Sequence, residues 1–139
     1  NFSKMFQYIQ IGQGHLYLDK PATPFDSGMF IKIRRNNKEY SLDALSGGER
    51  TLVALMFIFA MQLFKPSPFY ILDEVDSALD KPNSQNLTEL VHKMANNSQF
   101  IVVSHNDIIM SGSDSVIGVA KVGGASKLVG VKLKQVATA

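Results

Sequence analysis

The sequence contains no cysteine and no apolar run long enough to cross a membrane. Without cysteine the chain can form neither a disulfide nor a metal site built on thiolates. Its longest apolar stretch, residues 52–64, is interrupted by Gln62 and is more typical of a buried core helix than of a transmembrane one. The chain also opens without a charged and then apolar leader, so we expect no secretory signal and no membrane partner.

An excess of either charge is also missing. The 139 residues include 14 basic and 12 acidic side chains, and a net charge of +2 does not by itself indicate a nucleic-acid-binding protein. With 45% hydrophobic and 19% charged residues, the composition is that of one globular domain and excludes a disordered tail or a long coiled coil. Arg34, Arg35 and Lys38 form a small basic cluster that could touch DNA, although so few charges are more typical of a solvated turn.

The first 44 residues predict a helix followed by a small antiparallel sheet. Phe2, Met5, Phe6 and Ile9 have helical spacing, which predicts a helix over residues 1–11. Strands are expected at residues 15–18, 29–35 and 38–42, and the pair of asparagines at 36–37 indicates a tight hairpin turn between the last two.

The remainder alternates between helices and strands and predicts an α/β fold. A helix that follows residues 46–49 and runs to about residue 64 is apolar almost all round, so we expect it to be buried. Residues 69–72 are an uninterrupted apolar run, typical of a parallel strand covered on both faces. Asp80 should cap the next helix, with Pro82 in its first turn. The later elements are a strand at 100–103, a short helix at 108–110, and a hairpin of strands 116–120 and 128–133.

The segment LSGGE at residues 45–49 is suited to binding phosphate. Gly47 and Gly48 would let backbone N–H groups approach an anion closely, and the helix behind them points its positive end the same way. Ser46 adds a hydroxyl donor. Taken alone, the SGG triplet is more typical of a flexible loop with an N-capping serine.

The segment FYILDE at residues 69–74 brings two carboxylates to the end of an expected strand. The carboxyl ends of strands are where α/β sheets place ligands. Asp73 is suited to hold Mg²⁺, and Glu74 to orient and deprotonate an attacking water. The alternative is a strand that simply ends in a polar turn.

Two weaker motifs follow. Residues 77–80, SALD, are by themselves only a helix cap, and His105 follows the next expected strand after Ser104. A histidine at that place can donate to a phosphate oxygen or to a positioned water, although a lone histidine is more often structural. The joint order of the four motifs, with an apolar helix between the first two and strand ends under the second and fourth, leaves little room for coincidence.

These residues resemble the ATP-binding cassette class of ATPases. Residues 45–49 match its signature motif, 69–74 its Walker B motif with a catalytic glutamate, 77–80 its D-loop, and His105 its switch histidine. Within that class the chain is most similar to the C-terminal head segment of SMC proteins over residues 2–134. DEVDSALD at 73–80 is close to that family's DEVDAALD, and KPSPF, QFIVVSHN and SKLVGVKL resemble its KPAPF, QFIVITHN and SKLVSVKL. Arg50 for lysine and Ser104 for threonine keep the charge and the hydroxyl.

The resemblance implies an α/β fold, the C-terminal lobe of an ABC-type ATPase head, with a mostly parallel central sheet, flanking helices and a small antiparallel region. It implies ATP and Mg²⁺ as cofactors. Glu74 and His105 would be catalytic, and Asp73 would hold the metal. The residues that would contact the nucleotide are Ser46, Gly47, Gly48, Glu49 and Asp80.

The phosphate-binding loop G-x-x-x-x-G-K-[ST] does not occur in the sequence. In SMC proteins this loop lies in the N-terminal head segment, so the resemblance implies that the chain is half of a head. Residues 1–14 would then be the coiled-coil base, 15–44 an antiparallel β part, and 45–139 the part with the signature and Walker B motifs.

The implied partners are the N-terminal head segment, a second SMC head that sandwiches ATP with the first, a kleisin subunit, and DNA. The implied location is cytoplasmic or nuclear and chromosome-associated. The alternatives are an SMC-like ATPase of double-strand-break repair and a non-catalytic interaction module of the same fold. A transporter's nucleotide-binding domain is disfavoured, because its phosphate loop precedes the signature on the same chain.

Overall fold

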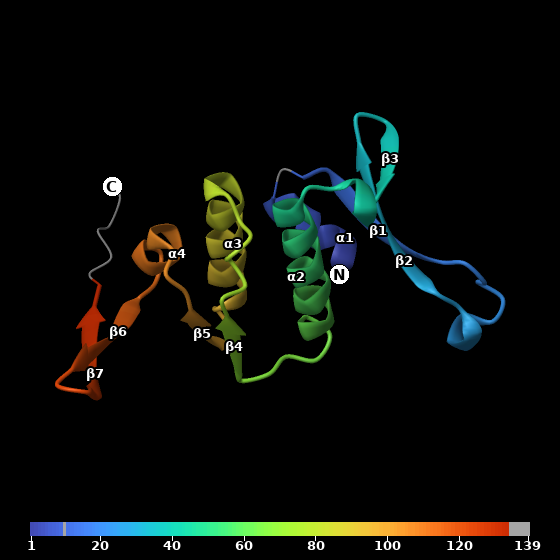
Figure 1. The fold of residues 1–139 in the computed structure, drawn as a ribbon. Helices are drawn as coiled ribbons and strands as arrows, with labels where there is room; N and C mark the ends of the chain where they lie inside the picture. The colour runs from blue at the N-terminus through green and yellow to red at the C-terminus, as the bar shows by residue number, and fades with distance from the viewer. Residues whose placement is uncertain (10, 134–139) are drawn as a thin grey trace, which may run out of the picture.

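The structure is a computed structural model that describes residues 1–9 and 11–133. Two long helices stand side by side in its middle, with an antiparallel sheet on one side and a hairpin on the other (Figure 1). The described residues include no helix that is both long enough and apolar enough to span a bilayer.

The N-terminal segment is helical for less of its length than its apolar spacing predicts. Helix α1 (Phe2–Met5) continues into the 3₁₀ turn η1 (Phe6–Tyr8), and Ile9 is extended. The prediction of a helix through residue 11 is therefore wrong. Ile9 and Ile11 are both buried although the helical turns end at Tyr8.

The antiparallel sheet is confirmed. Its strands β1 (Gln13–Leu18), β2 (Met29–Arg35) and β3 (Lys38–Ser41) pair in that order, with the turn η2 (Pro24–Asp26) between the first two. Asn36 and Asn37 have φ angles of 49° and 61°, the left-handed values that a two-residue hairpin turn requires. The short turn η3 (Leu42–Ala44) then leads to the first long helix.

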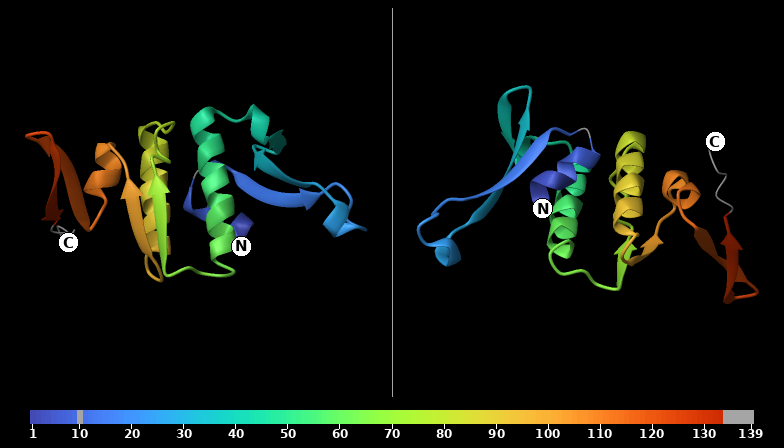
Figure 2. Two further views of the ribbon diagram at one scale, coloured as in Figure 1. Left: turned by 60° about the horizontal axis from the view of Figure 1, so that its bottom comes forward. Right: turned by 180° about the vertical axis from the view of Figure 1, so that it is seen from behind.

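The central unit confirms the α/β fold. Helices α2 (Gly47–Gln62) and α3 (Lys81–Met94) accompany the parallel strands β4 (Phe69–Asp73) and β5 (Gln99–Val103). Both helices begin at the end of the molecule where both strands finish (Figure 2). This shared polarity brings two helix N-termini and two strand C-termini to one end.

Most of the core lies around α2. Its buried side chains include Leu52, Met56 and Phe59, and they join buried residues of α1, β2 and α3 in one cluster. The ring of Phe59 meets that of Phe100 on β5 edge to face, with centroids 5.8 Å apart. This contact packs β5 against α2.

The opposite face of the parallel pair is exposed, so the expectation of cover on both faces is wrong for this chain. Phe69 and Ile71 on β4 are 53% and 62% exposed, and Ile101 and Val103 on β5 are 45% and 49% exposed. The reason is that the core cluster touches only the side of the pair that carries Leu72 and Phe100. The expectation that the first long helix is buried all round also fails at its last turns, where side chains such as Met61 are exposed.

The last described elements are α4 (Asp107–Ser111) and a hairpin of β6 (Ser115–Val122) and β7 (Ala125–Lys132). Gly123 and Gly124 form its turn with φ angles of 59° and 82°. The sequence expectations for residues 134–139 lie outside the described residues.

Candidate nucleotide site

The N-terminus of α2 is arranged to receive an anion. The Ser46 hydroxyl oxygen accepts a hydrogen bond from the Glu49 N–H at 3.3 Å, and the Glu49 carboxylate accepts one from the Ser46 N–H at 3.0 Å. This reciprocal capping leaves the Ser46 hydroxyl proton free to be donated. Gly47 and Gly48 are the first two helical residues, whose N–H groups have no partner within a helix. Capping and phosphate recognition are therefore compatible at this serine.

Gly48 allows α2 to pack closely on the segment before α3. A Cβ atom at Gly48 would lie 3.1 Å from Asn83 Nδ2 and 3.2 Å from the Ala78 carbonyl oxygen. A Cβ at Gly47 would meet no atom within 4 Å. One glycine is thus needed for close packing, and the other faces open space.

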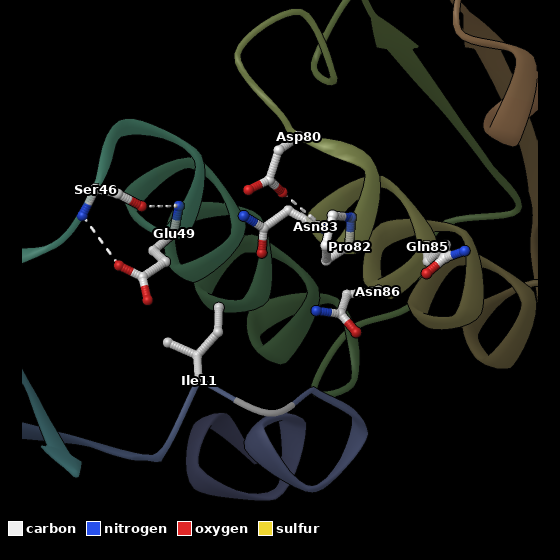
Figure 3. A pocket seen from close by; sticks show the side chains of 8 residues that line it. All are labelled: Ile11, Ser46, Glu49, Asp80, Pro82, Asn83, Gln85 and Asn86. Atoms are coloured by element: carbon white, nitrogen blue, oxygen red, sulfur yellow. Dashed lines mark hydrogen bonds between the residues drawn. The ribbon is translucent and has the colours of Figure 1, made fainter.

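The first and third motifs meet at a pocket of about 550 Å³. Ser46 and Glu49 line it from α2, while Asp80 and Asn83 line it from the start of α3 (Figure 3). Asp80 caps α3, because its carboxylate accepts a hydrogen bond from the Asn83 N–H at 3.0 Å. The predicted cap is confirmed, and Ser46 and Asp80 line one cavity.

The second and fourth motifs meet at the carboxyl edge of the parallel pair. Asp73 lies opposite Val103 in the register, and the Glu74 N–H donates to the Val103 carbonyl oxygen at 2.9 Å. Glu74 has a φ of 47°, a left-handed conformation that ends the strand abruptly. His105 follows β5 at the same edge. The side chains of Asp73, Glu74 and His105 are exposed, and none of them hydrogen-bonds to another described residue.

A buried hydrogen-bond network joins the two loops at this edge. The Ser104 hydroxyl donates to the Asp76 carboxylate at 2.6 Å and accepts from the Asn106 N–H at 2.9 Å. The Asn106 side-chain amide donates in turn to the Ser84 hydroxyl at 2.9 Å. Asp76 and Ser84 are buried, so these contacts are shielded from water. The network fixes the loop of Glu74 to the loop of His105 and both to α3.

Sequence reasoning named Ser104 but gave no role to the other members of this network, Asp76, Asn106 and Ser84. Asp76 lies two residues after Glu74, and Asn106 lies beside His105. Their proximity to proposed catalytic residues was the available signal, but no local pattern shows that an aspartate pairs with a serine just after the next strand.

Glu49 is engaged on both carboxylate oxygens. One accepts from the Ser46 N–H, and the other accepts from the Arg35 guanidinium at 2.7 Å. The hydrogen bond from Arg35 and, next, that from the Ser46 backbone hold the pKa of Glu49 below its usual range. Arg34 pairs instead with Glu39 at 3.2 Å. Arg34 and Arg35, two members of the basic cluster, therefore already pair with acidic side chains. This pairing favours a structural role near the hairpin turn over a contact with DNA.

Asp73 fits a magnesium site completed by a nucleotide. Within residues 1–9 and 11–133, no three histidine or acidic side chains converge on one point. Mg²⁺ is usually held by one or two carboxylates together with substrate phosphates and waters, so a single exposed carboxylate suffices.

Comparison with known proteins identifies the family. The model of the "RecF/RecN/SMC N terminal domain" matches residues 6–127. The chain belongs to the RecF/RecN/SMC family. It is 45% identical over 134 residues to the chromosome partition protein Smc of Methanocaldococcus jannaschii, and 39% identical over 137 residues to that of Pyrococcus furiosus. These alignments cover 96% and 97% of the chain but only 11% and 12% of the relatives, so the chain spans a small part of their length.

The fold agrees with SMC heads of known structure. An Smc head solved with the C-winged helix domain of ScpA aligns with a TM-score of 0.88 at 38% identity, over 96% of this chain and 42% of that one. A chain from a study of ATP-driven dimerisation and DNA-stimulated activation of SMC ATPases aligns with a TM-score of 0.85 at 37% identity. That alignment covers 95% of this chain and 81% of the other. The α/β fold described above is thus that of an SMC ATPase head.

Proposed function

We propose that this chain is the C-terminal half of an SMC ATPase head, which binds and hydrolyses ATP together with an N-terminal head segment. One observation carries the proposal. The side chains of Asp73, Glu74 and His105 lie at one sheet edge with no hydrogen-bonding partner among the described residues, while the sequence has no phosphate-binding loop. A site with catalytic groups but no phosphate cradle requires a second polypeptide segment.

The exposed sheet face supports the same division. Phe69, Ile71, Ile101 and Val103 form an apolar surface of the kind that proteins bury at interfaces. The N-terminal head segment would cover this face and bring its phosphate loop toward the carboxyl edge. On this proposal residues 1–14 are the coiled-coil base, residues 15–44 the antiparallel part, and residues 45–139 the part that meets ATP.

The residues at the sheet edge have distinct proposed roles. Asp73 would hold Mg²⁺, which supplies neutralising charge between the phosphates. Glu74 would take a proton from the attacking water, and His105 would donate a hydrogen bond to a phosphate oxygen. The network through Asp76 and Ser104 supports these roles, because it holds the two loops at a fixed separation.

The N-terminus of α2 would act on the nucleotide of a second head. Ser46, Gly47 and Gly48 would meet its γ-phosphate, and the open space at Gly47 leaves room for that approach. The Glu49 carboxylate would repel a phosphate directly, so its part is to orient Ser46. Asp80 would line the interface between the two heads. ATP would then favour the paired state because the pair makes a phosphate contact that separate heads lack.

We infer the biological setting from the relatives. Those quoted above are chromosome partition proteins, and the solved neighbours include one bound to ScpA and one from a study of DNA-stimulated activation. We propose that the whole protein takes a kleisin subunit of the ScpA type, acts on DNA, and is associated with the chromosome.

Reconstitution tests this function. The chain is mixed with the N-terminal head segment of the same protein, and phosphate release is measured as the concentration of the complex rises. Neither part alone should turn over ATP, and the specific activity of the mixture should rise with concentration because two heads must meet. A folded, nucleotide-binding complex with no turnover would instead favour a non-catalytic interaction module.

A further inference from the structure

We propose that Arg35 is a positioning residue for Ser46: it holds the Glu49 carboxylate in the orientation that aligns Ser46 for a phosphate of the second head. This inference rests on the proposed function. It adds a residue that lies outside all four motifs. Arg35 is on the antiparallel sheet, whereas the second and fourth motifs follow the parallel strands β4 and β5.

The first support is that the Glu49 carboxylate is shared between Arg35 and Ser46. Arg35 ends β2, and its Nη2 donates to Glu49 Oε1 at 2.7 Å. The other oxygen of Glu49, Oε2, accepts from the Ser46 N–H at 3.0 Å. With both oxygens bound, rotation of the carboxylate would break one hydrogen bond. Without Arg35, one oxygen would be free and the side chain could leave the cap.

The second support is that the same guanidinium ties down a third segment. Arg35 Nε donates to the Ile11 carbonyl oxygen at 3.0 Å. Ile11 is buried and lines the same pocket as Ser46 and Glu49 (Figure 3). Arg35 thereby connects the segment before β1 to the N-terminus of α2. A planar guanidinium offers donors on separate nitrogens in a fixed fork and can serve both acceptors together, whereas the three donors of an ammonium group share one nitrogen.

The third support concerns what the contact is for. The Arg35 side chain is 40% exposed and that of Glu49 is 23% exposed. Ion pairs this open to water contribute little to folding stability. The position of the Ser46 hydroxyl is more sensitive to this contact than folding stability is, because a small displacement of the hydroxyl can break its contact with a phosphate. Arg35 should therefore affect head pairing more than it affects folding.

The chain supplies a matched control. Arg34 precedes Arg35 on the same strand, and it pairs with Glu39 across the β2–β3 hairpin at 3.2 Å. Its change to methionine removes the same charge without touching α2. A general effect of charge or of sheet stability would appear in both variants.

The experiment uses the head assembled from this chain and the N-terminal segment, in a Glu74→Gln background that slows hydrolysis. ATP-dependent dimerisation is measured by analytical ultracentrifugation, and ATP binding is measured on monomeric heads. We expect Arg35→Met to weaken dimerisation about tenfold or more and Arg35→Lys to weaken it less, since loss of a charge-assisted hydrogen bond has effects of this order. Arg34→Met should match the unchanged head, and ATP binding should match in all variants.

A second measurement separates positioning from a structural role. In a Ser46→Ala background there is no hydroxyl to align, so Arg35→Met should cause no further loss of dimerisation. An additive loss would overturn the inference, as would equal dimerisation by Arg35→Met and Arg34→Met. Should Arg35→Met fail to fold, Arg35→Lys against Arg34→Lys decides by the same comparison. Unchanged heads that bind ATP but never dimerise would overturn the proposed function and this inference together.

Discussion

Glu74 and Asp73 are adjacent in sequence but differ in backbone geometry. Asp73 completes β4, whereas Glu74 has the left-handed φ of 47° and its N–H is held by the Val103 carbonyl. The two neighbouring carboxylates therefore stand on different backbone conformations, in keeping with the different roles proposed for them. A glutamate in this conformation is uncommon, and the hydrogen bond to β5 shows what maintains it.

Glu74→Gln should separate ATP binding from hydrolysis. Glutamine keeps the shape of the side chain and removes its capacity to accept a proton. In the reconstituted head we expect unchanged ATP affinity and a turnover lower by about 10²–10⁴-fold, the usual contribution of a general base. Binding is measured by calorimetry and turnover by phosphate release. Equal turnover in the two proteins would show that Glu74 is not the base.

The ionised form of Glu49 should make a small contribution to stability in a defined pH range. Its pKa is lowered in the folded chain, chiefly by Arg35, so its stabilisation is present above the unfolded value near 4.5 and is lost as the pH falls through the folded value. Urea unfolding at pH 7 and at decreasing acid pH should show this loss, with Glu49→Gln reducing it. Asp43→Gln, in the exposed part of η3, is the control. Identical pH curves for Glu49→Gln and the unchanged chain would contradict the assigned cause.

At the scale of elements, the helix N-termini and strand ends were largely predictable. Ser46 and Asp80 were recognised as caps because short polar side chains before an apolar period are local signals. The turn of Asn36 and Asn37 was equally local. The hydrogen bond from Arg35 to Glu49 joins β2 to the first turn of α2. Hydrophobic periodicity within one element does not predict a polar contact between two elements. The apolar run of β4 was misjudged for a related reason, since hydrophobicity does not say which segment covers each face.

The contact between α2 and the segment before α3 is tested by a pair of glycine substitutions. Gly48→Ala would place a Cβ 3.2 Å from the Ala78 carbonyl oxygen, while Gly47→Ala meets nothing within 4 Å. We expect Gly48→Ala to be the less stable variant by about 1 kcal/mol, a small overpacking cost. Urea denaturation of the two variants side by side measures the difference. Equal stability would mean that the segment yields to the added methyl group.

At the scale of the whole molecule, the parts of the proposed site lie at one end, while the apolar sheet face lies along the side of the parallel pair. The α2 and α3 N-termini share their end with the C-termini of β4 and β5 (Figure 2). The exposed residues Ile71 and Ile101 lie on these same strands, so a segment that packs on them would also reach the carboxyl edge. Assembly with the missing segment and completion of the site should therefore be one event.

This coupling predicts that a charge on the sheet face abolishes both assembly and ATP binding. Ile71 is 62% exposed in the isolated chain, so Ile71→Glu should fold normally here. Burial of the new carboxylate under the N-terminal segment would cost several kcal/mol, enough to prevent association. Phe25→Glu is the control, because Phe25 lies fully exposed in η2, far along the chain from the parallel pair. Assembly is measured by size-exclusion chromatography and ATP binding by calorimetry. Ile71→Glu should lose assembly and ATP binding, and Phe25→Glu should keep them. Normal assembly of Ile71→Glu would mean that the N-terminal segment packs on another surface.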